Sequence, residues 1–252
     1  VKALEGNPDV AGITSPDGGQ VAYGYDGVGN RVRVTYPGGQ QATYAFDADD
    51  HLQSVTTAEG VTAYTRDATG LPLRVDYPNG AYVAYEYDGA GHVVGVTNGN
   101  AGGTFANYAF TLDEVGNKTQ KVETLVEGTS TTVVTTTYTY DARDQLVDSV
   151  ASDGVETHYA FDAAGNRVWM AGVRQGESGL EPYNVDYVYS AANQLLSADD
   201  SLRGLTMYTY NANGARIVRL EAERRVVYSY DAEDRLVHAS SGAPFSVYLP
   251  LI

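Results

Sequence analysis

The sequence predicts an all-β fold, a repetitive antiparallel meander of β-hairpins that curls along its length. Three observations favour this fold. A Tyr-x-Tyr-Asp pattern recurs about every twenty residues, a Gly, Asn or Asp stands three residues after each Asp position, and the composition includes 21 Tyr, 28 Gly and no Cys. Tyr, Thr and Val favour strands, whereas Gly, Asp and Asn favour tight turns.

The first strand of each repeat carries the aromatic residues. The pattern starts at Tyr23-Gly-Tyr25-Asp26 and occurs ten times at spacings of 20 to 28 residues, with Phe110-Thr-Leu112-Asp113 as a degraded copy. Because side chains alternate along a strand, both aromatics of one copy point to the same face. The other aromatic positions are Tyr44, Phe46, Tyr64, Tyr85, Tyr87, Tyr138, Tyr140, Tyr159, Phe161, Tyr187, Tyr189, Tyr208, Tyr210, Tyr228 and Tyr230.

A turn follows each aromatic strand. Its first position holds Asp26, Asp47, Asp67, Asp88, Asp113, Asp141, Asp162, Ser190, Asn211 and Asp231. Short side-chain oxygens at this position accept backbone N–H bonds in a type I turn. The position three residues on holds Gly29, Asp50, Gly70, Gly91, Gly116, Asp144, Gly165, Asn193, Gly214 and Asp234, the residue types that tolerate positive φ. The columns therefore predict a type I turn followed by a left-handed residue and a G1 bulge.

A returning strand and a second turn complete each repeat. Residues 31–34 alternate in polarity, and Pro37-Gly38-Gly39 and Pro78-Asn79-Gly80 are typical of turns. Ten repeats then make about twenty strands in one repeat region over residues 1–252, without a separate second domain. The polar insertions at 97–103 and 175–182 are expected to extend hairpins. A twisted sheet of this extent has to curl or spiral.

Composition limits the function classes. The formal net charge of −16 argues against nucleic acid as a partner and against binding to an anionic membrane surface. Without Cys there are no disulfides and no thiolate metal ligands, and no apolar run approaches the ~18 residues of a membrane helix. The chain begins at Val1 without a signal-peptide pattern, so we expect it to be a piece of a longer protein.

The ten copies resemble the Rhs/YD-repeat family, whose repeat is written around Tyr-Asp-x-x-Gly-Arg/Asn, over residues 15 to 240. The resemblance implies a β-ribbon that spirals into a hollow shell. Bacterial members are secreted or surface toxin components whose shell encloses a C-terminal toxic domain, and teneurins use a similar shell in adhesion. The family's Asp-Pro-containing cleavage site has no counterpart, because none of the eight prolines follows Asp.

No catalytic, metal or cofactor site is predicted. His51 and His92 stand just after the turn, where other repeats carry Asn or Gln, and His158 and His238 have no repeating carboxylate partner. The acidic runs at 47–50 and 199–200 lack the spacing of calcium loops, and the patterns of nucleotide, hydrolase and zinc-protease sites are missing. The tyrosine column can be a packed stripe or a platform for sugars, and we favour packing.

The leading functional hypothesis is a non-enzymatic structural shell segment of a secreted or surface bacterial Rhs/YD-repeat protein, part of a hollow β-cage that encloses or carries a toxin or effector. The alternative is an adhesion or carbohydrate-binding cell-surface module. Expected partners are neighbouring repeats of a longer chain, copies of the chain through edge strands, an enclosed effector domain or carbohydrate. An extracellular or cell-surface location follows from the resemblance, whereas no membrane insertion is expected because no apolar run is long enough.

Overall fold

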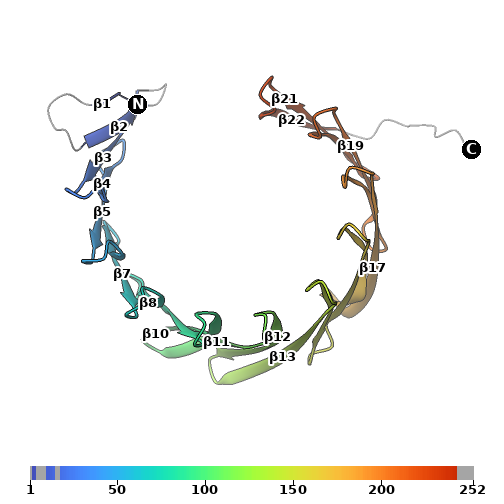
Figure 1. Cartoon of the computed structure of the whole chain (residues 1–252), viewed down its shortest axis with the longest axis horizontal. Coiled ribbons are helices and arrows are strands. Elements are labelled where there is room, and N and C mark those ends of the chain that lie inside the picture. The colour runs from blue at the N-terminus through green and yellow to red at the C-terminus, as the bar shows by residue number, and fades with distance from the viewer. Residues whose placement is uncertain (1, 4–9, 15–17, 243–252) are drawn as a thin grey trace, which may run out of the picture. The chain divides into compact units, whose positions relative to one another are not determined.

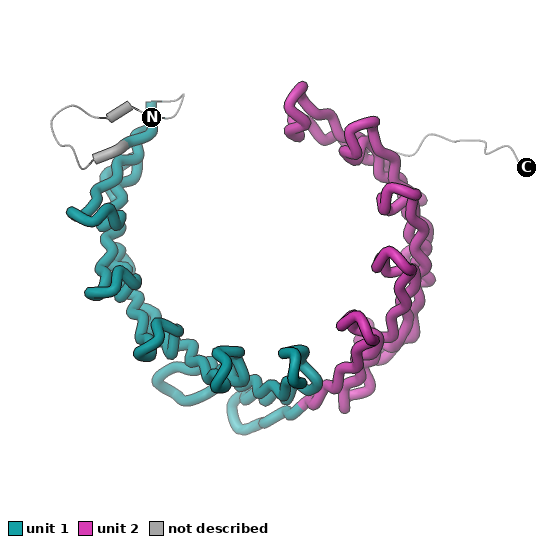
Figure 2. The backbone as a smooth tube through the Cα atoms, in the orientation of Figure 1, with its two compact units in different colours: residues 1–133 teal, residues 134–252 magenta. Residues whose placement is uncertain are grey.

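The computed structural model describes residues 2–3, 10–14 and 18–242. The regular secondary structure of those residues consists of β-strands alone (Figure 1). The chain forms two compact units, residues 1–133 and 134–252 (Figure 2). Unit 1 contains β1 (Lys2–Ala3), β2 (Val10–Thr14), β3 (Gln20–Tyr25), β4 (Arg31–Thr35), β5 (Gln41–Phe46), β6 (Leu52–Thr57), β7 (Gly60–Arg66), β8 (Pro72–Asp76), β9 (Tyr82–Tyr87), β10 (Val93–Asn100), β11 (Gly103–Leu112) and β12 (Lys118–Glu127).

The boundary between the units lies within β13 (Ser130–Tyr140). Unit 2 continues with β14 (Leu146–Ala151), β15 (Glu156–Phe161), β16 (Arg167–Gly176), β17 (Gly179–Tyr189), β18 (Leu195–Asp200), β19 (Gly204–Tyr210), β20 (Arg216–Leu220), β21 (Arg225–Tyr230) and β22 (Leu236–Gly242). The same repeat is present in both units. That residues 1–252 form one repeat region without a second domain stays a prediction.

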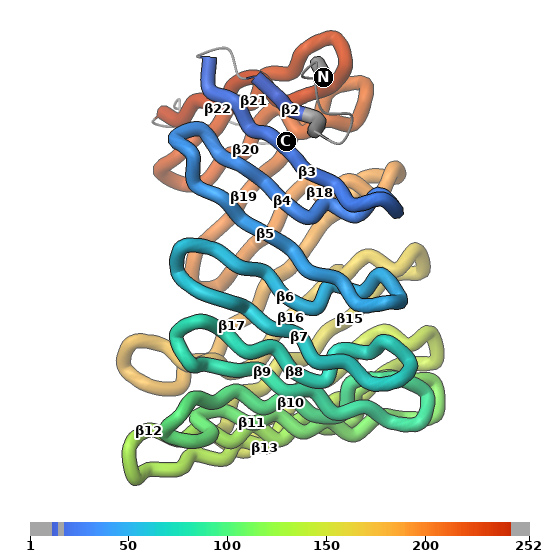
Figure 3. The backbone as a smooth tube through the Cα atoms, turned by 90° about the vertical axis from the view of Figure 1, so that its left-hand side faces the viewer, coloured from blue at the N-terminus to red at the C-terminus, as the bar shows by residue number. Residues whose placement is uncertain are grey.

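The strands pair in chain order. Each strand from β1 to β12 is antiparallel to the next one in unit 1, and the same holds from β13 to β22 in unit 2. Figure 3 shows the turns of unit 1 in two rows at opposite ends of its strands. The ribbon of each unit bends along its length (Figure 2). The predicted antiparallel hairpin meander is confirmed.

The longer repeats extend their hairpins, as expected. β16 and β17 stay paired to Gly176 and Gly179, so most of the polar stretch 175–182 is strand and only residues 177 and 178 form the turn. β10 and β11 likewise pair as far as Asn100 and Gly103. The insertions therefore add ladder hydrogen bonds to the sheet, and they do not form linkers between domains.

A thin core lies on one face of the sheet in each unit. Among the described residues other than glycine, the buried ones are Val34, Ala42, Val75, Ala106, Thr136, Val185 and Val226. Val34 and Val75 lie opposite the first aromatic of a repeat, as Val34 lies opposite Tyr23. The others precede the first aromatic on the same strand by two residues, as Ala42 precedes Tyr44, or by four in the case of Ala106. Residues so placed share a face of the sheet. We call this face, which carries the Tyr-x-Tyr aromatics, the tyrosine face.

Candidate functional site

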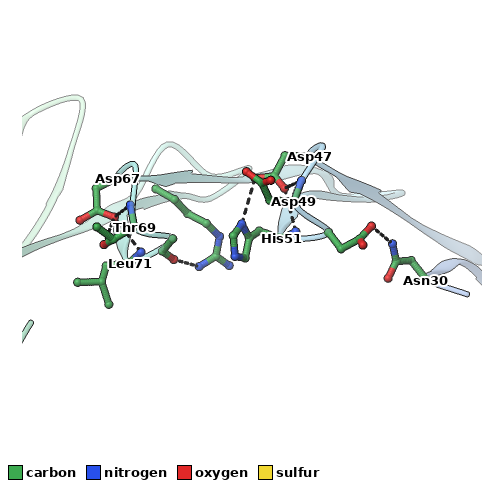
Figure 4. A network of polar contacts seen from close by, with 10 residues as sticks. Asn30, Asp47, Asp49, His51, Asp67, Thr69 and Leu71 are labelled. Atoms are coloured by element: carbon green, nitrogen blue, oxygen red, sulfur yellow. Dashed lines mark hydrogen bonds and ion pairs between the residues drawn. The ribbon is translucent and has the colours of Figure 1, made fainter. Parts of the chain in front are cut away.

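The Asp turn has the predicted geometry in every repeat. At Asp67, Oδ1 accepts the backbone N–H groups of Thr69 at 2.8 Å and Leu71 at 3.0 Å (Figure 4), and the Gly70 N–H donates to the Asp67 carbonyl at 3.1 Å. The first-position side chains of the other nine turns accept the equivalent two N–H bonds. The hydrogen bond from the Thr69 hydroxyl, with those backbone bonds, lowers the pKa of Asp67.

The third residue after each first position is left-handed, also as predicted. Its φ lies between +57° and +99° in all ten turns, and Asp50, Asp144, Asn193 and Asp234 are the non-glycine residues with positive φ among those described. The strand pairing shifts register beside each turn, for example between Gly24 and Tyr25. The ten hairpins therefore carry the bulge that this turn type produces.

Basic side chains lie between the rings of the tyrosine face. The Arg31 guanidinium carbon is 5.7 Å from the Tyr23 ring centre and 5.3 Å from that of Tyr44 in the next repeat. Arg167 and Arg216 bridge two repeats in the same way, at 4.8 to 5.7 Å. Such contacts contribute about 0.5–1 kcal/mol each at exposed positions. Sequence reasoning did not single out these arginines, although Gly-Asn-Arg follows the turn at both 29–31 and 165–167.

The second tyrosine of several repeats is fixed by its hydroxyl group. Tyr87 Oη donates to the carbonyl of Pro72 at 2.7 Å, and Tyr210 Oη donates to that of Leu195 at 2.8 Å. Tyr230 donates to the carbonyl of Arg216 at 2.9 Å. Each acceptor is the second residue after the left-handed position of the preceding repeat. Burial raises the pKa of Tyr87 and Tyr210, which keeps the hydroxyl protonated as a donor.

The arginine contacts and the hydroxyl bonds support packing as the role of the tyrosine column. A hollow of about 670 Å³ nevertheless opens on the tyrosine face of unit 2, with Tyr187 and Tyr208 among its walls. Its rim carries carboxylates and guanidinium groups, including Asp200 and Arg203. The first of these is already engaged, because Asp200 Oδ1 accepts the N–H groups of residues 202 and 203.

Two of the four histidines, His51 and His92, contact the Asp of their own turn. His51 Nδ1 lies 3.4 Å from Asp47 Oδ2, and one ligand atom each of Asp47, Asp49 and His51 falls within 4.8 Å of the others (Figure 4). All three residues are exposed, and Asp47 already accepts two backbone N–H bonds. The acidic run at 47–50 is thus accounted for as turn chemistry.

His92 repeats the contact of the first histidine, with Nδ1 at 3.0 Å from Asp88 Oδ2. His158 has partners that the sequence did not reveal. Its Nδ1 lies 2.7 Å from Asp148 Oδ1, because the two residues are opposite each other in β15 and β14, and its Nε2 lies 3.9 Å from Glu156. Only the register of the strands brings this carboxylate to the ring.

The repeat of this chain is similar to that of a known protein family. The family model described as teneurin YD-shell matches residues 5–129, about half of the chain. The chain belongs to the YD-repeat family. The identification made from the ten sequence copies is confirmed.

Solved structures share the YD-repeat fold at low identity. The Tc holotoxin pore of Photorhabdus luminescens matches with a TM-score of 0.58 and 14% identity, over 86% of this chain and 14% of that chain. A crystal structure of TcdB2-TccC3 matches with a TM-score of 0.51 and 15% identity, over 90% of this chain and 16% of that chain. At these identities the likeness concerns the fold alone.

Two curated bacterial proteins match part of the sequence. They are the tRNA3(Ser)-specific nuclease WapA of Bacillus spizizenii, at 29% identity over 112 residues, and the tRNA nuclease WapA of Bacillus subtilis, at 28% identity over 112 residues. Each match covers 43% of this chain and 4% of the relative, so the YD-repeat chain spans a small part of their length. No helix within the described residues is long and apolar enough to cross a membrane.

Proposed function

We propose that the chain is a non-enzymatic section of the wall of a secreted or surface YD-repeat shell, which encloses or carries a separate effector. The observation that carries this proposal is the repetition of one hydrogen-bonded turn, one bulge and one tyrosine stripe through ten hairpins. Side chains devoted to joining neighbouring hairpins suit a wall. A catalytic centre would instead require one repeat whose polar side chains converge.

Two features favour a wall over a compact catalytic domain. Each unit is a single sheet layer, and its few buried side chains lie on the tyrosine face. The partial match to the WapA nucleases also fits a carrier role, because the matched 112 residues are a small fraction of those proteins. The nuclease activity that their names state is not assigned to this chain.

The proposal is tested with the full-length product of the gene that encodes these residues. We expect limited proteolysis to leave any effector segment intact while the shell is folded, and to degrade it once the shell is opened by Gly165→Val or by mild denaturant. Digestion of the effector segment at the same rate in both states would contradict enclosure.

The alternative, an adhesion module for carbohydrate, rests on the hollow at Tyr187 and Tyr208. Sugar rings can stack on exposed aromatic faces, but Arg167 and Arg216 already contact these two rings. A glycan array probed with the purified chain separates the two functions. Saturable binding that Tyr208→Ala abolishes would favour the adhesion module.

A further inference from the structure

One pair of positions recurs where consecutive turns of the ribbon contact one another. In this pair, and from here on, the first position means the residue immediately after the left-handed residue, not the Asp position that opens the turn. The second position is the left-handed residue of the following repeat. Asn30 Nδ2 donates to Asp50 Oδ1 at 2.8 Å (Figure 4), and Asn166 Nδ2 donates to Asn193 Oδ1 at 2.9 Å. An Asn at the first position therefore faces an oxygen-bearing side chain at the second.

Longer side chains at the first position face glycine at the second. A Cβ built on Gly70 would lie 3.0 Å from His51 Nε2, which is closer than ordinary van der Waals contact. The other pairs of this kind are His92 with Gly116, Gln145 with Gly165 and Gln194 with Gly214, each at 3.4 Å, and Leu71 with Gly91 at 3.6 Å. At Gly70 even a Cβ would be too close. At the other four glycines a Cβ would be in ordinary van der Waals contact, and the carboxylate beyond it would lie against the long side chain.

A small residue, Ala215, holds the first position of the pair after Gly214. Ala215 cannot reach across to the next turn, and the second position there is Asp234. Its carboxylate instead accepts hydrogen bonds from Asn213 Nδ2 at 3.0 and 3.1 Å. At Asp50, Asn193 and Asp234, the preceding repeat therefore offers the left-handed side chain both space and an N–H donor.

We propose that this pair of positions is a matching rule by which each hairpin recognises its neighbour. A long residue at the first position specifies glycine at the second, and Asn at the first position specifies Asp or Asn. The left-handed φ alone does not explain the choice, because Asp50 and Gly70 both have positive φ in otherwise equivalent turns. The rule makes the residue after each turn a determinant of hairpin order and register.

A double-mutant cycle on the 252-residue chain tests the rule. Gly70→Asp should lower the urea midpoint, because its carboxylate meets His51. Adding His51→Asn should recover more than half of that loss, since the pair then matches the Asn30 and Asp50 combination. The matched control is Gly80→Asp, where φ is likewise positive, +80° against +89° at Gly70, but nothing lies within 4 Å of a Cβ. His51→Asn should restore nothing to the control variant.

Equal and additive effects in the two cycles would overturn the rule. If Gly70→Asp does not fold, the reverse cycle with Asn30→His and Asp50→Gly gives the same decision. There the single change Asn30→His should lower the midpoint, and adding Asp50→Gly should raise it again. A double variant less stable than Asn30→His alone would equally overturn the proposal.

The rule also describes a partner for the edge at β22, which pairs with β21 alone among the described strands. All seven residues of β22 are exposed, whereas Leu52 and Leu195 in the equivalent strands are half-buried. Arg235, the residue after the left-handed Asp234, holds the first position of the pair at the last described turn, and its side chain is 73% exposed. Because Arg is long, the hairpin that docks on β22 should be a further YD repeat with glycine at its left-handed position.

This edge is tested by replacing residues 243–252 with a copy of residues 59–76, which contains the Gly70 turn. Amide exchange in β22 should slow at least tenfold with the glycine copy, and should stay fast when the copied glycine is Asp. Equal protection by both copies would refute the glycine requirement. No protection by either copy would refute β22 as a docking edge for a YD hairpin.

Discussion

Replacing Gly165 by Val is expected to destabilise the hairpin of β15 and β16 by about 1–3 kcal/mol more than replacing its neighbour Ala164 by Val. Gly165 has a φ of +87°, a region in which a β-branched residue is strongly disfavoured. A Cβ at this position would also lie 3.4 Å from Gln145 Nε2, so the two Cγ atoms of Val have little space. Ala164 is exposed and is not among the residues with positive φ.

Urea unfolding followed by fluorescence measures this difference. Trp169 is the single tryptophan and pairs with Ala160 across the same hairpin, so it reports on local unfolding. A local probe is needed because repeat arrays can unfold in parts. At a slope of ~2 kcal/mol/M the two midpoints should differ by about 0.5–1.5 M. Gly165→Asn should be milder than Gly165→Val, since Asn193 occupies the same column at +58°. Equal midpoints for the two Val variants would refute the bulged-turn assignment.

Three further outcomes are expected. Tyr87→Phe should lower the free energy of unfolding by about 1 kcal/mol, because the hydrogen bond to the Pro72 carbonyl is lost. Urea unfolding compares it with Tyr85→Phe, whose hydroxyl forms no hydrogen bond within the described structure. Equal losses of stability in the two variants would count against this role. Arg167→Met keeps the aliphatic stem but should lower the free energy of unfolding by about 1 kcal/mol, because the contacts with the Tyr159 and Tyr187 rings are lost. A urea midpoint like that of the wild type would show that these ring contacts contribute nothing. The backbone N–H bonds that lower the pKa of turn residues such as Asp88 contribute stability above the unfolded value of ~3.9, and this is lost as pH falls through the folded pKa. The urea midpoint should therefore be lower at pH 3 than at pH 6, and an unchanged or higher one would contradict the turn chemistry.

The turns could be predicted from sequence because their chemistry is local. Asp67 bonds to N–H groups two and four residues away, and the residue type three positions on must tolerate positive φ. Residue types at short spacing are therefore sufficient to predict the turn. The alternation of the Tyr-x-Tyr strands is local in the same sense, and it correctly placed both aromatics on one face.

The contacts between hairpins could not be predicted in the same way. The Tyr87 hydroxyl meets a carbonyl 15 residues earlier, and Arg31 meets a ring 13 residues later. Both contacts depend on the register and twist of the sheet, which a periodic pattern leaves open. His158 and Asp148 likewise meet only because their strands pair at that register. Pairwise regularities such as His51 with Gly70 become visible once the turns are stacked.

The wall role is tested most directly by a cryo-electron microscopy reconstruction of the full-length gene product that contains these residues. The proposed function predicts a hollow β-shell in which the ten hairpins run in sequence order as part of the wall. The aromatic side chains of the tyrosine face should pack between neighbouring repeats, and density for a separate segment should lie in the interior. An isolated ribbon without an enclosed volume, or a solid globular domain built around these hairpins, would contradict it.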